Sequence, residues 1–252
     1  MMGDSALFDR LVAEALAQPF EGWNFSYIAD RWREAPTSWD YRAKARALMA
    51  GASSLLDMDT GGGEVLASLA PFPPLACATE GWDPNVPVAR VRLEPLGVRV
   101  ERVDSESDLP FSDAMFDLVL NRHGDYHPSE LRRILKPGGR FLTQQVGGQN
   151  CIELNELLQD RVEFKYSYWT LDYALRELRD AGFEIVESRD EHPETIITDI
   201  GAVVYLLRIV SWQIADFSVE KYRHKLMALH NRIQEKGPLV IHAHRLYIEA
   251  QR

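Results

Sequence analysis

Short apolar runs of strand length alternate with amphipathic segments of helical length between residues 53 and 188. The strand candidates are 53–58, 75–80, 98–103, 116–121, 141–146 and 183–188. Parallel strands that follow one another along a chain need crossover connections, and helices usually supply them. The alternation therefore predicts an α/β fold with a doubly wound, mostly parallel sheet, whose ligands bind at the carboxyl ends of the strands.

Start and stop residues place the helices between these strands. A short helix follows the turn DTGGG and ends before Pro71, and Pro128 opens the helix SELRRIL, which the turn KPGG closes. Thr170 is the predicted N-cap of a helix that Gly182 ends. The final segment HRLYIEAQR has the pattern of an edge strand that completes a seven-stranded, Rossmann-like sheet.

No linker of flexible composition divides the 252 residues into independent domains. We expect an aromatic-rich, helical N-terminal cap over 1–50, the ligand-binding core over 51–192, a helical insertion over 193–237 and the last strand of the core sheet over 238–252. The insertion is predicted from the helical patterns GAVVYLLRIVSWQ and SVEKYRHKLMALHNRIQEK.

The chain is acidic, with 38 Asp and Glu residues against 28 Lys and Arg residues and a formal net charge of -10. Nucleic-acid binding draws its affinity from the neutralisation of phosphates, so this balance disfavours a nucleic-acid partner, although a local basic patch stays an alternative. Arg132, Arg133, Lys136 and Arg140 are the candidates for such a patch. Their position around a helix end and a turn favours a solvated face instead.

We expect no metal site. Cys77 and Cys151 lack metal-ligand spacing, and His242 and His244 lie two apart on one face of the predicted last strand without an evident third ligand. The N-terminus lacks the basic stretch and apolar core of a signal peptide, and the longest apolar run, 202–207, is too short to span a membrane. The expectation is a cytoplasmic enzyme without a membrane partner, either a monomer or a homodimer.

Two features at strand ends point to a nucleotide-like ligand. The turn DTGGG joins a buried strand to a helix, so its backbone N–H groups can approach a ligand closely, although glycines there also suit a simple tight turn. The next strand ends at Glu80, whose carboxylate can accept hydrogen bonds from both ribose hydroxyls of an adenosine. Enzymes that use NAD and enzymes that use S-adenosylmethionine share this second feature.

Four stretches make the pattern more specific: LLDMDTGGGEVL, ATEGWDPN, ESDLPFSDAMFDLVLNRH and LRRILKPGGRFLTQQVG. Their order and spacing resemble the class I S-adenosylmethionine-dependent methyltransferases over roughly residues 50–190. Dinucleotide dehydrogenases do not carry the succession of LPF, FDLV and LKPGG. The resemblance implies a type 11 methyltransferase domain with S-adenosylmethionine as its cofactor.

The resemblance assigns cofactor contacts residue by residue. Asp57, Gly61 and Gly63 match the motif that holds the methionine part of the cofactor. Glu80 matches the acid that binds the ribose, and Trp82 beside it can cover a ribose or adenine face.

Two further loops match the family. Asp104 and Ser105 correspond to the loop that contacts adenine. Asn121, Arg122 and His123 follow the fourth strand, where family members place residues beside the transferring methyl group. We assign Asn121 to the cofactor, Arg122 to the acceptor and His123 to catalysis.

Two positions depart from the family pattern. Asp59 stands where the family usually has the first glycine of its motif. A carboxylate there would repel the cofactor's carboxylate and attract its ammonium group, so we include Asp59 among the cofactor contacts. Asp104 lies one residue farther from LPF than is usual, which makes Glu106 a rival for the adenine contact.

His123 is the candidate general base, because an imidazole titrates near neutrality; the alternative is a histidine that only hydrogen-bonds a loop backbone. Aromatic residues crowd the range 23–41. Trp23 and Tyr27 are assigned to the acceptor pocket, where their π faces can meet the sulfonium cation. Packing of a helical cap onto the sheet is the competing, and favoured, explanation for this crowding.

These features predict transfer of a methyl group to a small-molecule oxygen or nitrogen acceptor by in-line displacement, with catalysis mostly through positioning. Methylation of RNA or protein is one alternative. Binding of S-adenosylmethionine without turnover is the other, and Asp59 makes it conceivable.

Overall fold

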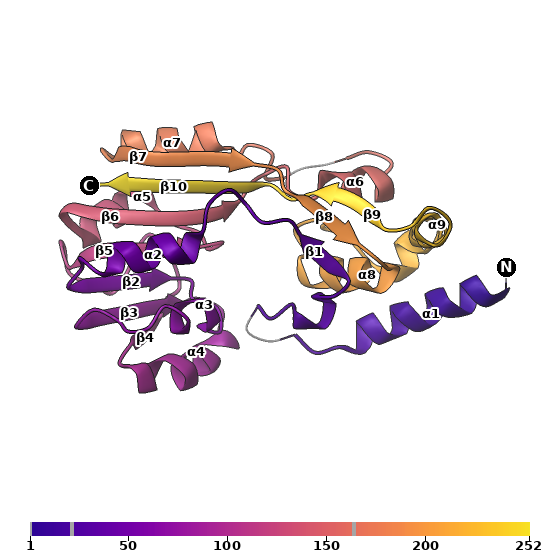
Figure 1. The fold of residues 1–252 in the computed structure, drawn as a ribbon, viewed down its shortest axis with the longest axis horizontal. Coiled ribbons are helices and arrows are strands. Elements are labelled where there is room, and N and C mark those ends of the chain that lie inside the picture. The colour runs from indigo at the N-terminus through magenta and orange to yellow at the C-terminus, as the bar shows by residue number, and fades with distance from the viewer. Residues whose placement is uncertain (1, 21–22, 163–164) are drawn as a thin grey trace.

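Two lobes lie side by side in the computed structural model of the chain, which describes residues 2–20, 23–162 and 165–252 (Figure 1). The large lobe is built on a seven-stranded sheet, and the small lobe combines a three-stranded sheet with helices. The N-terminal helix belongs to the small lobe, whereas the C-terminal strand ends in the large lobe. The chain therefore crosses between the lobes several times.

The seven strands of the large sheet lie in the order β4-β3-β2-β5-β6-β10-β7. Their bounds are β2 Ser54–Met58, β3 Leu75–Glu80, β4 Arg99–Arg102, β5 Phe116–Arg122, β6 Leu135–Val146, β7 Glu184–Glu191 and β10 Arg245–Gln251. The first five strands in this order pair in parallel, and β10 runs antiparallel to both of its neighbours. The predicted doubly wound, mostly parallel, Rossmann-like sheet is confirmed.

Helices cover both faces of this sheet. On one face lie α2 Tyr41–Met49, α3 Glu64–Ala67 and α4 Asn85–Leu93, followed by a 3-10 turn at Glu94–Leu96, and on the other face lie α5 Pro128–Ile134 and α7 Leu171–Asp180. Successive residues of β2 serve the two cores in turn: Leu55 packs with the first group of helices and Leu56 with the second. Burial of both strand faces explains why the parallel strands have continuous apolar sequences.

Two local predictions are wrong. The last strand, β10, lies between β6 and β7 rather than at the edge. Its Glu249 is completely buried and lies 2.6 Å from Lys44 and 2.6 Å from Arg140, so the charge of Glu249 is neutralised inside the sheet. The KPGG segment was predicted as a turn, but it belongs to β6. The pairing of β6 with β5 is irregular there, with a shift in register near Phe116.

The small lobe contains a sheet that the sequence did not predict. Its strands, β1 Trp32–Glu34, β8 Glu194–Ile197 and β9 Leu239–His242, pair antiparallel in the order β1-β8-β9. Its helices are α1 Met2–Ala17, α6 Ile152–Leu158, α8 Ile200–Ile209 and α9 Val219–Lys236, with a 3-10 turn at Ser26–Ile28. The helices predicted within 193–237 are confirmed as α8 and α9, whereas 239–242 belongs to this small sheet.

A separate hydrophobic core holds the small lobe together. Phe8 of α1, Val203 of α8, Leu226 of α9 and Ile241 of β9 are all completely buried in it. The aromatic N-terminal segment and the helical insertion therefore form one structural unit. None of the described helices is long and apolar enough to cross a membrane.

Candidate functional site

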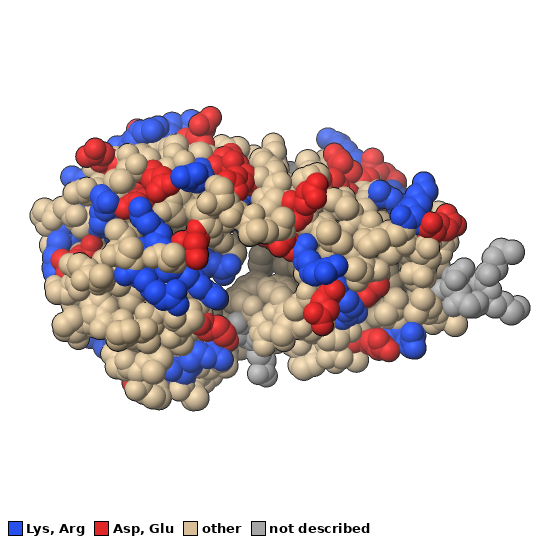
Figure 2. Space-filling view, in the orientation of Figure 1, with Lys and Arg blue, Asp and Glu red and all other residues tan. Residues whose placement is uncertain are grey.

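The carboxyl ends of the parallel strands face the small lobe, as the arrow of β6 shows in Figure 1. At this place a hollow lies between the lobes, with Lys and Arg side chains on its rim (Figure 2). β2 lies between β3 and β5, so the turns after these three strands are neighbours. The fold thereby brings together the predicted groups around Asp57, Glu80 and Asn121.

Left-handed backbone conformations shape the turn after β2. Asp59, Gly61 and Gly63 have φ angles of 52°, 63° and 80°. A Cβ on Gly63 would lie 2.8 Å from Cγ of Leu93, so a larger residue fits only if Leu93 moves. Aspartate tolerates the left-handed region better than most residues, which explains how Asp59 replaces the expected glycine. Its carboxylate accepts the backbone N–H of Asp125 at 3.1 Å.

Two carboxyl groups, one at the end of β2 and one in the turn after it, have raised pKa values. Burial raises the pKa of Asp57 to about 7, opposed by hydrogen bonding and by the charge of Arg122. Burial also raises the pKa of Asp59 to about 7, and the charges of Glu106 and Glu80 add to the rise. Neighbouring buried carboxylates resist ionising together unless a cation joins them, so this end of the site attracts positive charge.

Glu80, at the end of β3, is buried with 4% of its surface exposed. Its Oε1 accepts the backbone N–H of Trp82 at 2.8 Å. Burial raises the pKa of Glu80, while hydrogen bonds from Trp82, from the Asn85 side chain and from the backbone of Gly61 oppose the rise. The bond from Gly61 ties this carboxylate to the turn after β2, so the two predicted parts of the cofactor site are held together.

An aromatic cluster, formed by Phe20, Trp23, Phe25, Trp82 and Trp212, joins the two lobes beside Glu80. The ring of Trp82 lies 6.4 Å from that of Trp23 and 6.5 Å from that of Phe20, and Trp23 lies 5.8 Å from Trp212. The three tryptophans Trp23, Trp82 and Trp212 nevertheless expose 42%, 43% and 48% of their surfaces. The cluster therefore has aromatic surface left for a ligand.

Tyr27, the other aromatic residue assigned to the acceptor pocket, contacts the small lobe instead. Its ring lies 4.9 Å from the ring of Tyr205, and the guanidinium of Arg31 lies 4.4 Å from its centroid. Trp23, in contrast, contacts the large lobe through Trp82. The contacts connect Trp23 with the strand ends and show Tyr27 as part of the small-lobe packing.

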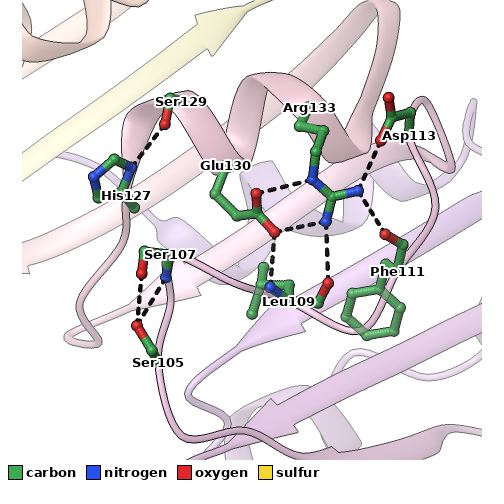
Figure 3. A network of polar contacts seen from close by, with 9 residues as sticks. All are labelled: Ser105, Ser107, Leu109, Phe111, Asp113, His127, Ser129, Glu130 and Arg133. Carbon is green, nitrogen blue, oxygen red and sulfur yellow. Dashed lines mark hydrogen bonds and ion pairs between the residues drawn. The ribbon is translucent and has the colours of Figure 1, made fainter.

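An arginine of α5 fixes the loop after β4. Arg133 donates to the carbonyl oxygens of Leu109 at 3.0 Å and Phe111 at 2.6 Å (Figure 3). It also pairs at 2.6 Å with Glu130, which accepts the N–H of Leu109 at 2.7 Å. This network holds the LPF motif against α5 and thereby sets the course of the loop.

The residues assigned to adenine in this loop differ in their surroundings. Asp104 is exposed and pairs with Arg102, and the Ser105 hydroxyl forms hydrogen bonds within its own loop. Glu106 is only partly exposed, and its charge raises the pKa of Asp59. The rival residue Glu106 is thus electrostatically coupled to the turn after β2.

Asn121, at the end of β5, is completely buried and hydrogen-bonded to the protein. Its Oδ1 accepts from Thr143 at 3.0 Å and from Gln145 at 2.5 Å, and its Nδ2 donates to the carbonyl of Asp125 at 3.2 Å. Asp125 also donates its N–H to Asp59. Asn121 therefore holds the loop after β5 against the turn after β2.

His123 follows with a left-handed φ of 66° and is held by Gln144. Its backbone N–H donates to the carbonyl of Gln144 at 2.8 Å, and the two side chains meet at 3.1 Å between their Nε2 atoms. The indole N–H of Trp39 donates to Oε1 of Gln144 at 2.9 Å. The Gln144 amide must then present its NH2 group to the imidazole, so Nε2 of His123 is the acceptor.

The protonation state of His123 follows from its desolvation and from nearby charges. Its side chain is exposed, yet desolvation by neighbouring protein lowers the pKa of His123 well below its ordinary value. The charges of Arg122 and Arg245 lower the pKa further. At neutral pH the imidazole is uncharged, and the nitrogen that could take a proton already accepts from Gln144.

Arg122 is the residue before His123, and its side chain is also exposed. Desolvation lowers the pKa of Arg122, and the positive charges of Arg245 and Arg42 add to this effect, whereas Tyr41 and Glu34 oppose it. The end of β5 therefore favours an anion.

The predicted pair His242 and His244 does not share a strand, because the chain leaves the small sheet at His242 and enters β10 only after His244. His244 lies instead with Asp190 and His192 in a group of potential metal ligands. The two rings of that group are stacked, 4.3 Å apart at an angle of 17°, so their in-plane nitrogens do not converge on one ion. Nδ1 of His244 accepts the N–H of Gln149 at 3.0 Å, and Nε2 lies 3.0 Å from Asp190. We interpret this group as a hydrogen-bonded joint between the lobes.

Each of the four candidates for a basic patch is exposed or partly exposed and has a partner within the fold. The pairs are Arg132 with the Gly182 carbonyl at 2.8 Å, Arg133 with Glu130 at 2.6 Å, Lys136 with Asp117 at 2.9 Å and Arg140 with Glu249 at 2.6 Å. Their charges are used to fix loops and strands of the large lobe.

Sequence reasoning missed the residues that hold the end of β5. Gln144 and Gln145 fix His123 and Asn121, and Trp39 fixes Gln144. The sequence did contain a signal. Two adjacent glutamines stand near the end of the stretch FLTQQV, whereas buried parallel strands normally carry apolar residues. Trp39 had no such signal, since its partner lies 105 positions away.

Comparison with known proteins agrees with this geometry. Residues 56–143 match a family model described as a methyltransferase domain. The fold is similar to a protein from Bacillus halodurans named as a candidate methyltransferase, with 22% identity, a TM-score of 0.58, and 83% of this chain and 96% of that chain covered. A protein of unknown function from Deinococcus radiodurans is 14% identical, with a TM-score of 0.58 and coverage of 97% and 98%.

A third similar structure is a chain in the complex between the methyltransferase activator Trm112 and a candidate methyltransferase of Haloferax volcanii. It is 20% identical, with a TM-score of 0.51 and coverage of 97% of this chain and 95% of that chain. No curated protein matches the chain.

Proposed function

We propose that the chain is a class I S-adenosylmethionine-dependent methyltransferase, that it binds S-adenosylmethionine at the ends of β2 and β3, and that it methylates a small-molecule oxygen or nitrogen acceptor at the end of β5. The observation that carries the proposal is the gathering of Asp57, Asp59 and Glu80 at adjoining strand ends, next to exposed tryptophans.

The chemistry of these groups fits the cofactor. Its two ribose hydroxyls suit the buried carboxylate of Glu80, and its ammonium and sulfonium cations suit the carboxyl groups of Asp57 and Asp59. The glycine backbone of the turn after β2 allows close approach. The exposed face of Trp82 can cover the adenosine or meet the sulfonium through a cation–π contact.

The small lobe supports the choice of a small acceptor. We propose that the N-terminal segment and the insertion 193–237 roof the site, because Trp23 contacts Trp82 on the platform and Trp212 of the insertion contacts Trp23. Methyl transfer benefits when water is excluded and the acceptor is held in line. A folded RNA would need a broad basic surface, and the four candidates for such a surface are paired within the large lobe.

S-adenosylmethionine supplies a methyl group that its sulfonium already activates. The protein's part is to orient the acceptor atom and to exclude water. We propose that Asn121 and Gln144 position the acceptor side, and that His123 contacts the acceptor as a neutral hydrogen-bonding group. A role as general base would require His123 to give up its hydrogen bond from Gln144.

Isothermal titration tests the cofactor proposal. We expect one site for S-adenosylmethionine and one for S-adenosylhomocysteine, with no binding of NAD. Binding of NAD without either adenosyl ligand would contradict the proposal. Mass spectrometry of products from a panel of small acceptors then tests turnover, because an S-adenosylmethionine-binding protein without activity would bind the cofactor and release no methylated product.

A further inference from the structure

The side chain of Arg122 has no hydrogen-bond or ion-pair partner in the described part of the chain, whereas that of its neighbour Arg245 has several. Arg245, whose charge acts on it, is held by Glu34 at 2.9 Å and 2.5 Å and by Asn150 at 2.7 Å. The guanidinium of Arg122 forms neither a hydrogen bond nor an ion pair with any residue that the structure describes, and the same is true of the guanidinium of Arg42. Two guanidinium groups at the end of β5 and the start of α2 are thus available to a ligand.

The surroundings make this unpaired charge unfavourable without a ligand. The side chain of Arg122 is exposed, yet neighbouring protein desolvates it in part, and the positive charges of Arg245 and Arg42 repel it. Glu34 opposes that repulsion but is already engaged by Arg245. The charge of Arg122 lowers the pKa of Asp57, but the two side chains do not form an ion pair. A desolvated cation of this kind is stabilised by an anion that completes its hydrogen bonds.

We propose that the methyl acceptor carries an oxyanion, a carboxylate or a phosphate, and that Arg122 binds this group. The inference rests on the proposed function, because it takes the end of β5 as the acceptor side. A planar guanidinium presents paired N–H donors that match two oxygens of one oxyanion. Arg42 adds a second positive charge, which attracts an anionic acceptor to a chain whose net charge of -10 would otherwise repel it.

The rival ligand for Arg122 is the carboxylate of the cofactor's own methionine tail. Two adenosyl ligands separate these sources: S-adenosylhomocysteine has the tail, and methylthioadenosine lacks it. Titrations of both into the wild-type protein and into Arg122→Gln show whether the arginine contacts the cofactor. We expect the dissociation constant of each ligand to change less than about twofold, which is within the effect of a distant charge.

The second arm measures oxyanion binding to protein loaded with S-adenosylhomocysteine. Ligand-observed NMR compares benzoate and phenyl phosphate with benzamide, which has nearly the shape of benzoate without its charge. We expect at least one of the two anions to bind wild-type protein, and to bind Arg122→Gln at least fivefold more weakly, a change of about 1 kcal/mol. Arg179→Gln, which removes an exposed arginine at the end of α7, is the matched control and should behave as wild type.

Each outcome decides the inference. Equal anion binding by wild type and Arg122→Gln overturns it, and so does anion binding by neither protein. Loss of S-adenosylhomocysteine affinity with methylthioadenosine unchanged also overturns it, because the arginine then holds the cofactor. Failure of the wild-type protein to bind any adenosyl ligand is a separate result, and it refutes the proposed function itself. Arg122→Lys keeps the charge but lacks the paired N–H donors of a guanidinium, so it should restore part of the anion binding. This partial recovery would show that the loss in Arg122→Gln does not come from misfolding.

Discussion

The ends of β2 and β3 carry buried carboxyl groups, whereas the end of β5 carries guanidinium groups, and the two regions adjoin in one sheet. Desolvation acts on both in the same way, by disfavouring the charged form: it raises the pKa of Asp57 and Asp59 and lowers the pKa of Arg122 and His123. A cationic ligand would favour the ionised carboxylates at one end, and an anionic ligand would stabilise the charged guanidinium of Arg122 at the other. The acidic region therefore suits the cationic methyl donor that we propose, and the basic region suits an acidic acceptor.

The largest effect is expected at Glu80, which anchors the acidic region. Glu80→Ala should weaken binding of both adenosyl ligands at least tenfold, because each charge-assisted hydrogen bond to a carboxylate contributes about 1.5–3 kcal/mol. Isothermal titration measures the change, and circular dichroism checks the fold. Glu101→Ala is the control, since this acid on the neighbouring strand pairs with Arg99 at 2.9 Å. An unchanged dissociation constant would reject a ribose contact.

The next effect is a pH dependence that only the acidic region can produce. Asp57 and Asp59 have folded-state pKa values of about 7, above the ordinary range, so their contribution to the stability of the ligand-free fold is lost as the pH rises through 7. A cationic ligand favours the ionised carboxylates. Affinity for S-adenosylmethionine should therefore increase about tenfold from pH 6 to pH 8.

The comparison with S-adenosylhomocysteine sharpens this test. The product lacks the sulfonium charge, so its affinity should rise less with pH. Asp59→Asn should flatten the increase for S-adenosylmethionine, and asparagine tolerates the left-handed backbone at this position. A pH dependence that is identical in Asp59→Asn and wild type would show that Asp59 does not contact the cation.

The acidic region could be predicted from the sequence, and the basic region only in part. Asp57 and Glu80 lie at the ends of buried strands and the glycines follow β2, so local pattern and strand order bring them together. The small sheet had no comparable signal. Its strand β1 has three residues, and its partner β8 lies more than 150 positions later, so neither periodicity nor a turn marks the pairing.

Tertiary contacts also decided which charges stay free. Nothing in the local sequence distinguishes Arg133 from Arg122. Arg133 pairs with Glu130 and donates to two loop carbonyls, whereas the side chain of Arg122 has no partner among the described residues. Similarly, β10 has the sequence pattern of an edge strand, yet it lies between two strands, where Lys44 and Arg140 neutralise its buried Glu249. Pairing across such separations depends on the finished fold and leaves no local pattern.

A smaller effect is expected from the aromatic cluster, which borders the acidic region. Trp82→Ala should weaken S-adenosylmethionine about fivefold, since one stacking or cation–π contact contributes about 1 kcal/mol. The loss should be smaller for S-adenosylhomocysteine if the tryptophan faces the sulfonium. Tyr168→Ala, which removes an aromatic side chain with 54% exposure outside the cluster, is the control. Equal affinities in wild type and Trp82→Ala would leave the cluster as a structural link between the lobes.

The smallest effect is expected at His123, a neutral group within the basic region. Its Nε2 accepts from Gln144, and its pKa lies well below the ordinary value, so it is not protonated or deprotonated in the neutral range. His123→Asn, which suits the left-handed backbone, should lower kcat less than about threefold, whereas loss of a general base costs roughly a hundredfold or more. The profile of kcat against pH should show no inflection from His123 between pH 6.5 and pH 9.

Stability provides an independent readout of the same imidazole. Because the folded-state pKa of His123 is depressed, the unfolded chain binds a proton more readily, and this residue's contribution to stability is lost as the pH falls below the ordinary histidine value. Denaturant unfolding at pH 7 and pH 5 should therefore show a smaller loss of stability in His123→Asn than in wild type. A hundredfold fall in kcat together with a vanished inflection would instead make His123 the general base, and the basic region would then perform proton transfer as well as anion binding.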